Sequence, residues 1–340
     1  EFVQLLIDCK INLGMKNPCG STPLHYACQQ SNIEMVQLLI KYSTIDDAYA
    51  KGDSARTIFH FAAENSDVQV LKLILDTFKF EDLRDKHGYT MLLCAVESGP
   101  KETIEFLLES RHKIGFNTED RTSSGKTILH IACEQRDIEV IDPILKYIED
   151  NNIDIDLDTG DDIGHTPLHF SLANKKNHFS LWNKKSNPAV PIHLLKRLPT
   201  SKINDLELHG MNLLHCASKV GNVEFLKSVF EDPYFDIDVD CVDINGRTPL
   251  HHASLCGFAE VVKFLIKTYK SNGIDINAKD NNQQTAEDLM PLNYPDSYAI
   301  LMPYAIPGDD IRIRELFIAE RVVKREERVV TRSISKANKE

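Results

Sequence analysis

A recurring tetrapeptide constrains the fold of this chain more than any other feature of the sequence. It has the form Thr-Pro-Leu-His or a variant of it, and successive copies begin 33 to 46 residues apart. The copies begin at Thr22, Thr57, Thr90, Thr127, Thr166, Asn212, Thr248 and Thr285. A repeat of this length indicates a stack of small supersecondary units, because one unit alone cannot bury its apolar surface.

Each copy carries the signals of a tight turn followed by two helices. A glycine lies two residues before most copies, as at Gly20 and Gly246, and glycine accepts the positive φ of a tight turn. The Thr can cap a helix, and Pro suits the first helical position. Small residues such as Ala27 and Cys28 follow, and then an amphipathic run such as 33–40. The sequence therefore predicts a helix pair and a hairpin in every repeat.

A period near 33 residues with this tetrapeptide resembles the ankyrin repeat, and the resemblance covers about residues 1–305. It implies an all-α fold, an ankyrin-repeat solenoid of stacked helix-turn-helix units with projecting hairpins. We expect residues 1–13 to be a truncated repeat and residues 14–306 to be an array of about eight repeats, the last a degenerate cap. Residues 307–340 are expected to form a charged helical tail or linker.

Several copies depart from the pattern. The fifth copy contains an insertion at 174–189, and an acidic hairpin, 150–162, precedes it. The third copy has Met91 and Leu93 in place of Pro and His, so its first turn is less well specified. Pro143 lies in the second helical run of the fourth copy, where we expect it to kink or restart the helix.

The histidines of the tetrapeptide do not indicate chemistry. Six of the 13 histidines occupy its last position, where the resemblance implies bonds to the backbone or to the cap. The acidic run 154–158 has the spacing of a calcium loop, but Thr159 and His165 stand where Gly and Glu are required. We predict no catalytic residue, no metal site and no cofactor, and therefore no enzyme activity in these residues.

The net charge of the chain and the spacing of its cysteines indicate the kind of partner and the cellular location to expect. The net charge is −12; residues 307–340 hold 9 Lys/Arg and 7 Asp/Glu, which leaves −14 for residues 1–306. An acidic body argues against a nucleic-acid partner. No apolar run is long enough for direct membrane insertion. The eight cysteines are scattered without CxxC spacing, which favours reduced thiols in a cytoplasmic, intracellular protein.

The resemblance also implies where a protein partner would bind, namely the concave face and the hairpin tips. Residues at those positions differ in charge and size, so the sequence does not identify the partner. The partner-binding candidates are Tyr89, Glu97, Lys126, Glu134, Asp161, Asp162, His165, Trp182, Lys184, Lys219 and Arg247.

The leading hypothesis is a protein-protein interaction module that works as a scaffold or adaptor. A first alternative is that these repeats are the regulatory ankyrin segment of a larger enzyme or channel. A second alternative is a bacterial effector directed at a host. We further expect binding to depend on the middle of the array, where the repeats leave their own pattern, rather than on its ends.

Overall fold

In a computed structural model of the chain, the described residues contain helices and no strands. They form two compact units, residues 1–171 and 172–340, which are treated separately. The truncated repeat up to residue 11, nearly all of the insertion and the tail lie outside the described residues. The described ranges are 12–65, 67–80, 83–110, 120–153, 159–172, 189–197, 210–232, 235, 238–291 and 300–301.

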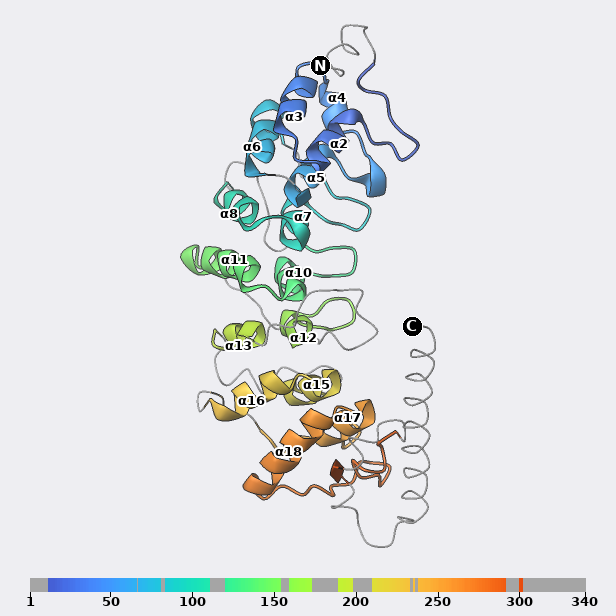
Figure 1. Cartoon of the computed structure of the whole chain (residues 1–340), viewed down its shortest axis with the longest axis vertical. Coiled ribbons are helices and arrows are strands. Elements are labelled where there is room, and N and C mark those ends of the chain that lie inside the picture. The colour runs from blue at the N-terminus through green and yellow to red at the C-terminus, as the bar shows by residue number, and fades with distance from the viewer. Residues whose placement is uncertain are drawn as a thin grey trace, which may run out of the picture. The chain divides into compact units, whose positions relative to one another are not determined.

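Unit 1 consists of two rows of helices, each row built from one helix per repeat (Figure 1). The inner row begins at the tetrapeptides and contains α2 (Pro23–Gln29), α5 (Ile58–Asn65), α7 (Met91–Ser98), α10 (Ile128–Gln135) and α12 (Pro167–Leu172). The outer row contains α3 (Ile33–Ile40), α6 (Val68–Thr77), α8 (Lys101–Glu109) and α11 (Ile138–Asp150). Two short elements, α4 (Ile45–Ala48) and η1 (Asp53–Ala55), connect the first two repeats.

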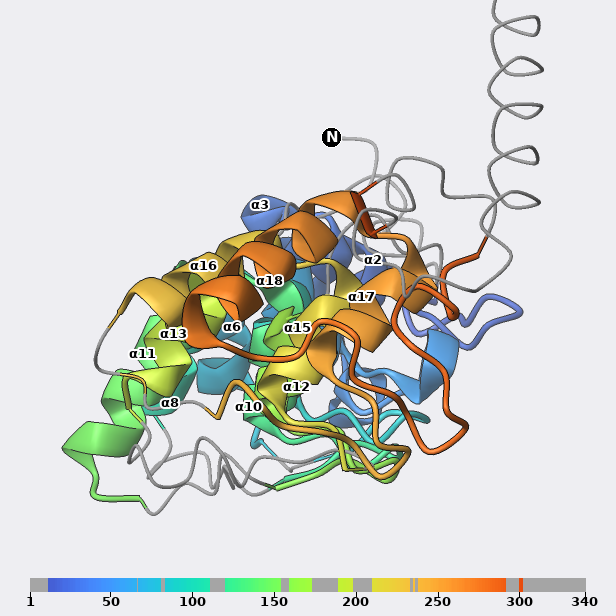
Figure 2. The same ribbon diagram turned by 90° about the horizontal axis from the view of Figure 1, so that it is seen from below.

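Unit 2 repeats the same arrangement. Its inner helices α15 (Leu213–Val220) and α17 (Pro249–Cys256) pack together. Its outer helices are α13 (Ala189–Leu195), α16 (Val223–Glu231) and α18 (Ala259–Asn272), and α16 contacts both of the others (Figure 2). The predicted all-α architecture of stacked helix pairs is thus confirmed.

The six inner helices whose tetrapeptide ends in His start with the same hydrogen-bond pattern, which explains that residue and its cap. In α10 the Nδ1 atom of His130 lies 3.1 Å from the backbone N of Thr127 and 2.8 Å from its Oγ1. Nε2 of the same ring lies 2.8 Å from the carbonyl oxygen of His165 in the next repeat. The imidazole therefore closes one helix end and joins two repeats. The same two contacts confirm the expected structural role for four further histidines, namely His25, His60, His215 and His251. His169 bonds to its own cap alone.

The glycines before the tetrapeptides allow neighbouring hairpins to approach each other. Gly88 has φ +78°, and a Cβ added there would lie 2.6 Å from the backbone N of Ser123 in the next hairpin. Gly246 has φ +71° and is equally close to the side chain of Asn281. Glycine is needed at these positions both for the left-handed backbone and for the close contact.

Two local expectations have different outcomes. The helix α11 runs through the buried Pro143 as a single element of 13 residues, so the expected restart is wrong. The proline removes one helical N–H donor and crowds the carbonyl group one turn earlier, and burial of α11 along Ile141, Ile144 and Ile148 compensates for that loss. In the last copy, Asp288 replaces His and its carboxylate accepts hydrogen bonds from Thr285 N and Oγ1, so the turn keeps its cap.

Candidate functional site

Three consecutive repeats of unit 1 carry a hydrogen-bonded pair of side chains on the inner row. In each pair, the residue just before the Thr cap donates to a glutamate eight positions later. We call these six residues the inner strip: Arg56 with Glu64 (2.5 Å), Tyr89 with Glu97 (3.1 Å), and Lys126 with Glu134 (2.7 Å). The charged side chains are only 12–21% exposed, so the strip is largely shielded from water.

The pairs are connected from one repeat to the next through Arg56. Its Nε donates to Oδ2 of the buried Asp85 at 3.1 Å, and its Nη2 lies 3.7 Å from Glu97. Asp85 in turn accepts hydrogen bonds from the backbone N of His87 and of Tyr89. One guanidinium thus serves three carboxylates and fixes the hairpin that presents Tyr89.

The inner strip carries more negative than positive charge. Together with Asp85 it contains four carboxylates and two cations. Burial raises the pKa of the Glu97 carboxyl, and the nearby Glu64 and Glu134 raise it further. Burial, and then the charge of Glu97, also raise the pKa of the Tyr89 phenol, which therefore remains a hydrogen-bond donor. Glu97 is the carboxylate with the weakest cationic partner, because Arg56 lies closer to Glu64 and Asp85.

Aromatic rings continue the strip into the fifth repeat. Lys126 Nζ lies 4.7 Å from the ring centroid of Phe170, a cation–π geometry. Phe170 also meets the rings of His130 and His165 edge-on, at 5.7 and 5.8 Å between centroids. The inner surface of unit 1 thus combines charged and aromatic side chains held in fixed positions.

The candidates in the hairpin before α12 divide into two kinds. Oδ1 of Asp161 accepts hydrogen bonds from the backbone N of Ile163 and His165, so this carboxylate holds its own turn together. Asp162 is exposed at the tip and His165 is half-buried beside it. Ile163, which sequence reasoning missed, is 66% exposed at the same tip. Its signal was an apolar residue in a turn position that holds Ser54, His87 and Ser124 in the three preceding repeats.

The remaining candidates belong to unit 2 or lie outside the described residues. Arg247 Nε donates to the buried Asp280 at 3.2 Å, which repeats the geometry of Arg56 with Asp85. Lys219 is exposed at the end of α15. Trp182 and Lys184 lie outside the described residues. The structure thus joins four candidates, Tyr89, Glu97, Lys126 and Glu134, in one surface.

The candidate set omitted Arg56 and Glu64, which complete the inner strip. A signal for them is present in the sequence. Arg56 with Glu64, and Lys126 with Glu134, are basic–acidic pairs eight residues apart. Tyr89 and Glu97 have the same spacing. The spacing was not recognised because charge pairs on one helix are expected three or four residues apart.

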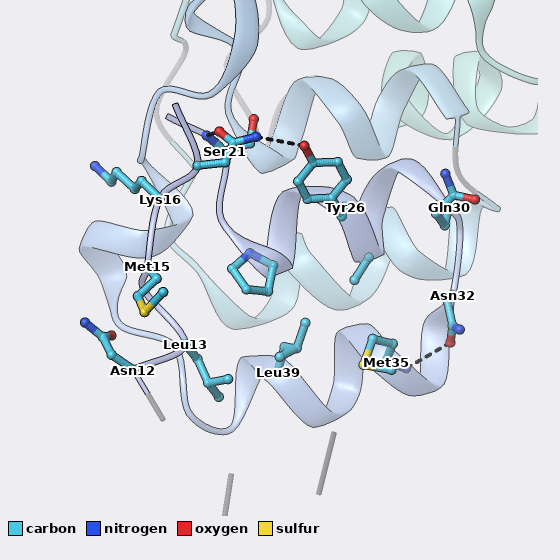
Figure 3. Close-up of a pocket in the computed structure, with 13 residues that line it drawn as sticks. Asn12, Leu13, Met15, Lys16, Ser21, Tyr26, Gln30, Asn32, Met35 and Leu39 are labelled. Atoms are coloured by element: carbon cyan, nitrogen blue, oxygen red, sulfur yellow. Dashed lines mark hydrogen bonds between the residues drawn. The ribbon is translucent and has the colours of Figure 1, made fainter. Parts of the chain in front are cut away.

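A pocket of about 650 Å³ lies against the first described repeat (Figure 3). Pro23 and Tyr26 of α2 line it, together with Met35 of α3, and all three are at least partly exposed. At the position of Tyr26, the next repeat has Phe61, which is 9% exposed and packs edge-on against His25. Pro23 likewise corresponds to the fully buried Ile58. The pocket is therefore the stacking face of a repeat.

The described part of the chain contains no group of three or more His, Cys, Asp or Glu side chains placed to hold a metal ion. None of its helices is long and apolar enough to span a membrane. Burial raises the pKa of the Cys28 and Cys216 thiols to about 12, so these cysteines are not activated nucleophiles.

Comparison with known families and curated proteins gives a consistent result. The family model described as ankyrin repeats matches three times, at residues 1–76, 43–120 and 178–280. The human transient receptor potential cation channel subfamily A member 1 is 24% identical over 257 residues, which are 74% of this chain and 20% of the channel. Human Rabankyrin-5 is 29% identical over 209 residues, 61% of this chain and 15% of that protein. The chain therefore spans a fifth or less of these two relatives.

Two further comparisons concern shorter proteins. The probable 26S proteasome regulatory subunit p28 of Saccharomyces cerevisiae is 27% identical over 207 residues, 61% of this chain and 80% of the subunit. Among solved structures, the ankyrin repeat domain of Bcl-3 matches with a TM-score of 0.50 at 19% identity. This match covers 83% of this chain and 98% of the domain. At that identity the match supports the fold alone.

Proposed function

Because the chain belongs to the ankyrin-repeat family, whose repeats are protein-interaction modules, we propose that it is a scaffold or adaptor that binds a partner protein through the inner strip of unit 1 and the neighbouring hairpin tips. The observation that carries the proposal is the strip itself, in which Tyr89 and Glu97 occupy the centre. The strip combines an aromatic hydroxyl, a guanidinium and carboxylates in a row of three hydrogen-bonded pairs.

The composition of the strip supports a binding role. Tyr and Arg are enriched among residues whose truncation weakens protein complexes most, and such residues lie in partly desolvated centres of interfaces. The side chains here are held by their neighbours before a partner arrives, so little rotamer entropy is lost on binding. The carboxylate of Glu97, which lies 3.7 Å from its cationic partner Arg56, favours a partner protein that brings a further hydrogen-bond donor or a cation to it.

The same reasoning extends to the wider functional class. We propose a module without enzyme activity that acts inside the cell, with protein rather than nucleic acid as its partner. The net charge of −12 supports this choice, because a polyanion would be repelled by most of the surface.

One alternative has an observation in its favour. The chain matches only 20% of the length of the cation channel and 15% of Rabankyrin-5, so it corresponds to a part of these larger proteins. A regulatory segment of a larger channel or enzyme therefore remains a second candidate function. Sequencing the complete transcript distinguishes the two, since the alternative requires a catalytic or pore domain in the same reading frame. The effector hypothesis stays a prediction.

Photo-crosslinking tests the proposed binding surface. Benzoylphenylalanine is incorporated at position 89 of the full chain, and in a matched variant at position 146, which is exposed on the outer helix α11. After affinity capture and irradiation, we expect covalent adducts to the partner from position 89 and none from position 146. Equal adducts from both positions, or adducts from position 146 alone, contradict the proposal.

A further inference from the structure

We propose that the outer helices of unit 2 form a second docking site, which binds an acidic segment of a partner protein that also carries apolar side chains. The site is a groove of about 480 Å³ lined by α16 and α18, which lie side by side in Figures 1 and 2. We call it the outer groove. It is separate from the inner strip, which belongs to unit 1, and does not depend on the function proposed above.

Lysines form the rim of the outer groove. Lys263, Lys267 and Lys270 are four and three residues apart on α18 and therefore share one helix face, and Lys227 of α16 completes the rim. Glu260 is the one acidic residue among the lining residues, whose net charge is +3, and Lys227 also forms an ion pair with Glu224 of α16 at 3.0 Å. Lys263 and Lys267 are exposed and have no ion pair with any described residue.

This positive charge differs from the rest of the outer surface. The outer helices of unit 1, α3, α6, α8 and α11, contain three lysines and nine acidic residues, a net charge of −6. The helices α16 and α18 contain four lysines and three glutamates, a net charge of +1, and the lysines all line the groove. A cationic groove on a chain with a net charge of −12 is a local feature, and a general need for solubility does not account for it.

The floor of the outer groove is apolar. Val223, Phe264 and Ile300 line it and are all partly accessible to solvent. Phe264 is held in place by an edge-on contact with Phe230, with 5.6 Å between the ring centroids. A cationic rim over an apolar floor is complementary to an apolar side chain flanked by carboxylates. The spacing of the lysines, about 10 Å along α18, matches two or three acidic residues of a short segment.

Other anionic occupants fit less well. A bilayer surface presents no side chain that could enter a recessed floor. A nucleic acid would use the lysines but not the aliphatic part of the floor. The positive charge of the rim and the apolar floor together therefore favour an acidic peptide segment that carries apolar side chains.

The test measures binding of a fluorescein-labelled peptide, Asp-Asp-Leu-Phe-Asp-Glu, to the full chain by fluorescence anisotropy. We expect Lys263→Glu/Lys267→Glu to weaken binding at least tenfold. The matched control Lys41→Glu/Lys146→Glu changes the net charge equally at exposed positions of unit 1 and is expected to change binding less than twofold. A peptide with Ser in place of Leu and Phe should also bind at least tenfold more weakly.

A second readout locates the peptide directly. A carbodiimide couples carboxylates to amines in contact, and mass spectrometry is expected to find the coupled lysines among those of the rim. The proposal is overturned if the peptide does not bind at 1 mM, or if both double variants weaken binding equally. It is also overturned if the Ser peptide binds as well as the original, or if heparin or anionic vesicles bind more tightly with the same dependence on Lys263 and Lys267.

Discussion

The buried imidazoles of the repeats make the stability of the fold dependent on pH. Burial lowers the pKa of His25, His60, His130 and His251, and it lowers the pKa of His169 to about 4. In the unfolded chain these side chains titrate near pH 6.5. Between these values the unfolded state binds more protons, so stability is complete above about pH 6.5 and is lost as the pH falls toward the folded pKa.

The magnitude can be worked out for His169, which is 9% exposed and whose Nε2 has no hydrogen-bond partner. One excess proton in the unfolded state changes stability by about 1.4 kcal/mol per pH unit. From pH 7 to pH 5, with a folded pKa of about 4, His169 alone therefore costs about 2 kcal/mol. The other four histidines act in the same direction.

Urea denaturation at intervals from pH 7.5 to pH 4.5, followed by circular dichroism, measures this loss. We expect His169→Gln to flatten the dependence of unfolding free energy on pH by about 2 kcal/mol between pH 7 and pH 5, whatever its effect at pH 7.5. The exposed His87 provides the control, since His87→Gln removes an imidazole that is not buried. A wild-type stability that stays constant down to pH 5 would refute the reasoning.

Three further predictions concern packing, the partly exposed face of α2 and metal. Gly88→Ala should destabilise the fold by about 2–4 kcal/mol in urea denaturation. Gly273 also has a positive φ, but no atom lies within 4 Å of a Cβ added there, so Gly273→Ala should cost about 1 kcal/mol. Equal losses for the two variants would contradict the close approach of hairpins at Gly88. Phe61→Ala should lower the free energy of unfolding by about 3–5 kcal/mol, and Tyr26→Ala by less than about 1 kcal/mol, because Phe61 is buried and Tyr26 is exposed. A large loss for Tyr26→Ala would show that the face around Tyr26 is covered. Dialysis against EDTA should leave the melting temperature unchanged to within about 2 °C, since no described side chains form a metal-binding group, and a larger drop would reveal a metal site.

The helical frame could be predicted because its determinants are local. A tetrapeptide such as that at Thr248 combines a cap, a first-turn proline and a histidine within four residues, and the helix α17 begins where the pattern predicts. The same logic failed at Pro143, where burial of a whole helix outweighs one lost hydrogen bond. The third copy, without Pro or His, still begins a helix because Thr90 caps it.

The inner strip could be predicted only in part. The repeat register predicts the positions of Tyr89 and Glu97 within their repeat. It does not predict the hydrogen bond between them, because that bond depends on the directions of the two side chains. The link from Arg56 to Asp85 crosses 29 residues and depends on how closely two repeats stack. The outer groove was missed because its lysines look like an ordinary solvated helix face until α16 is placed beside α18.

The most direct test of the central claim is a calorimetric titration of the captured partner into the chain and into two double variants. Tyr89→Ala/Glu97→Ala removes the centre of the inner strip, and Gln29→Ala/Gln30→Ala changes two exposed residues at the end of α2. With both variants folded, we predict at least about 30-fold weaker binding for the first, equivalent to about 2 kcal/mol, and less than about threefold for the second. Stronger weakening by the Gln29/Gln30 variant than by the Tyr89/Glu97 variant would contradict the claim that the partner binds through the inner strip.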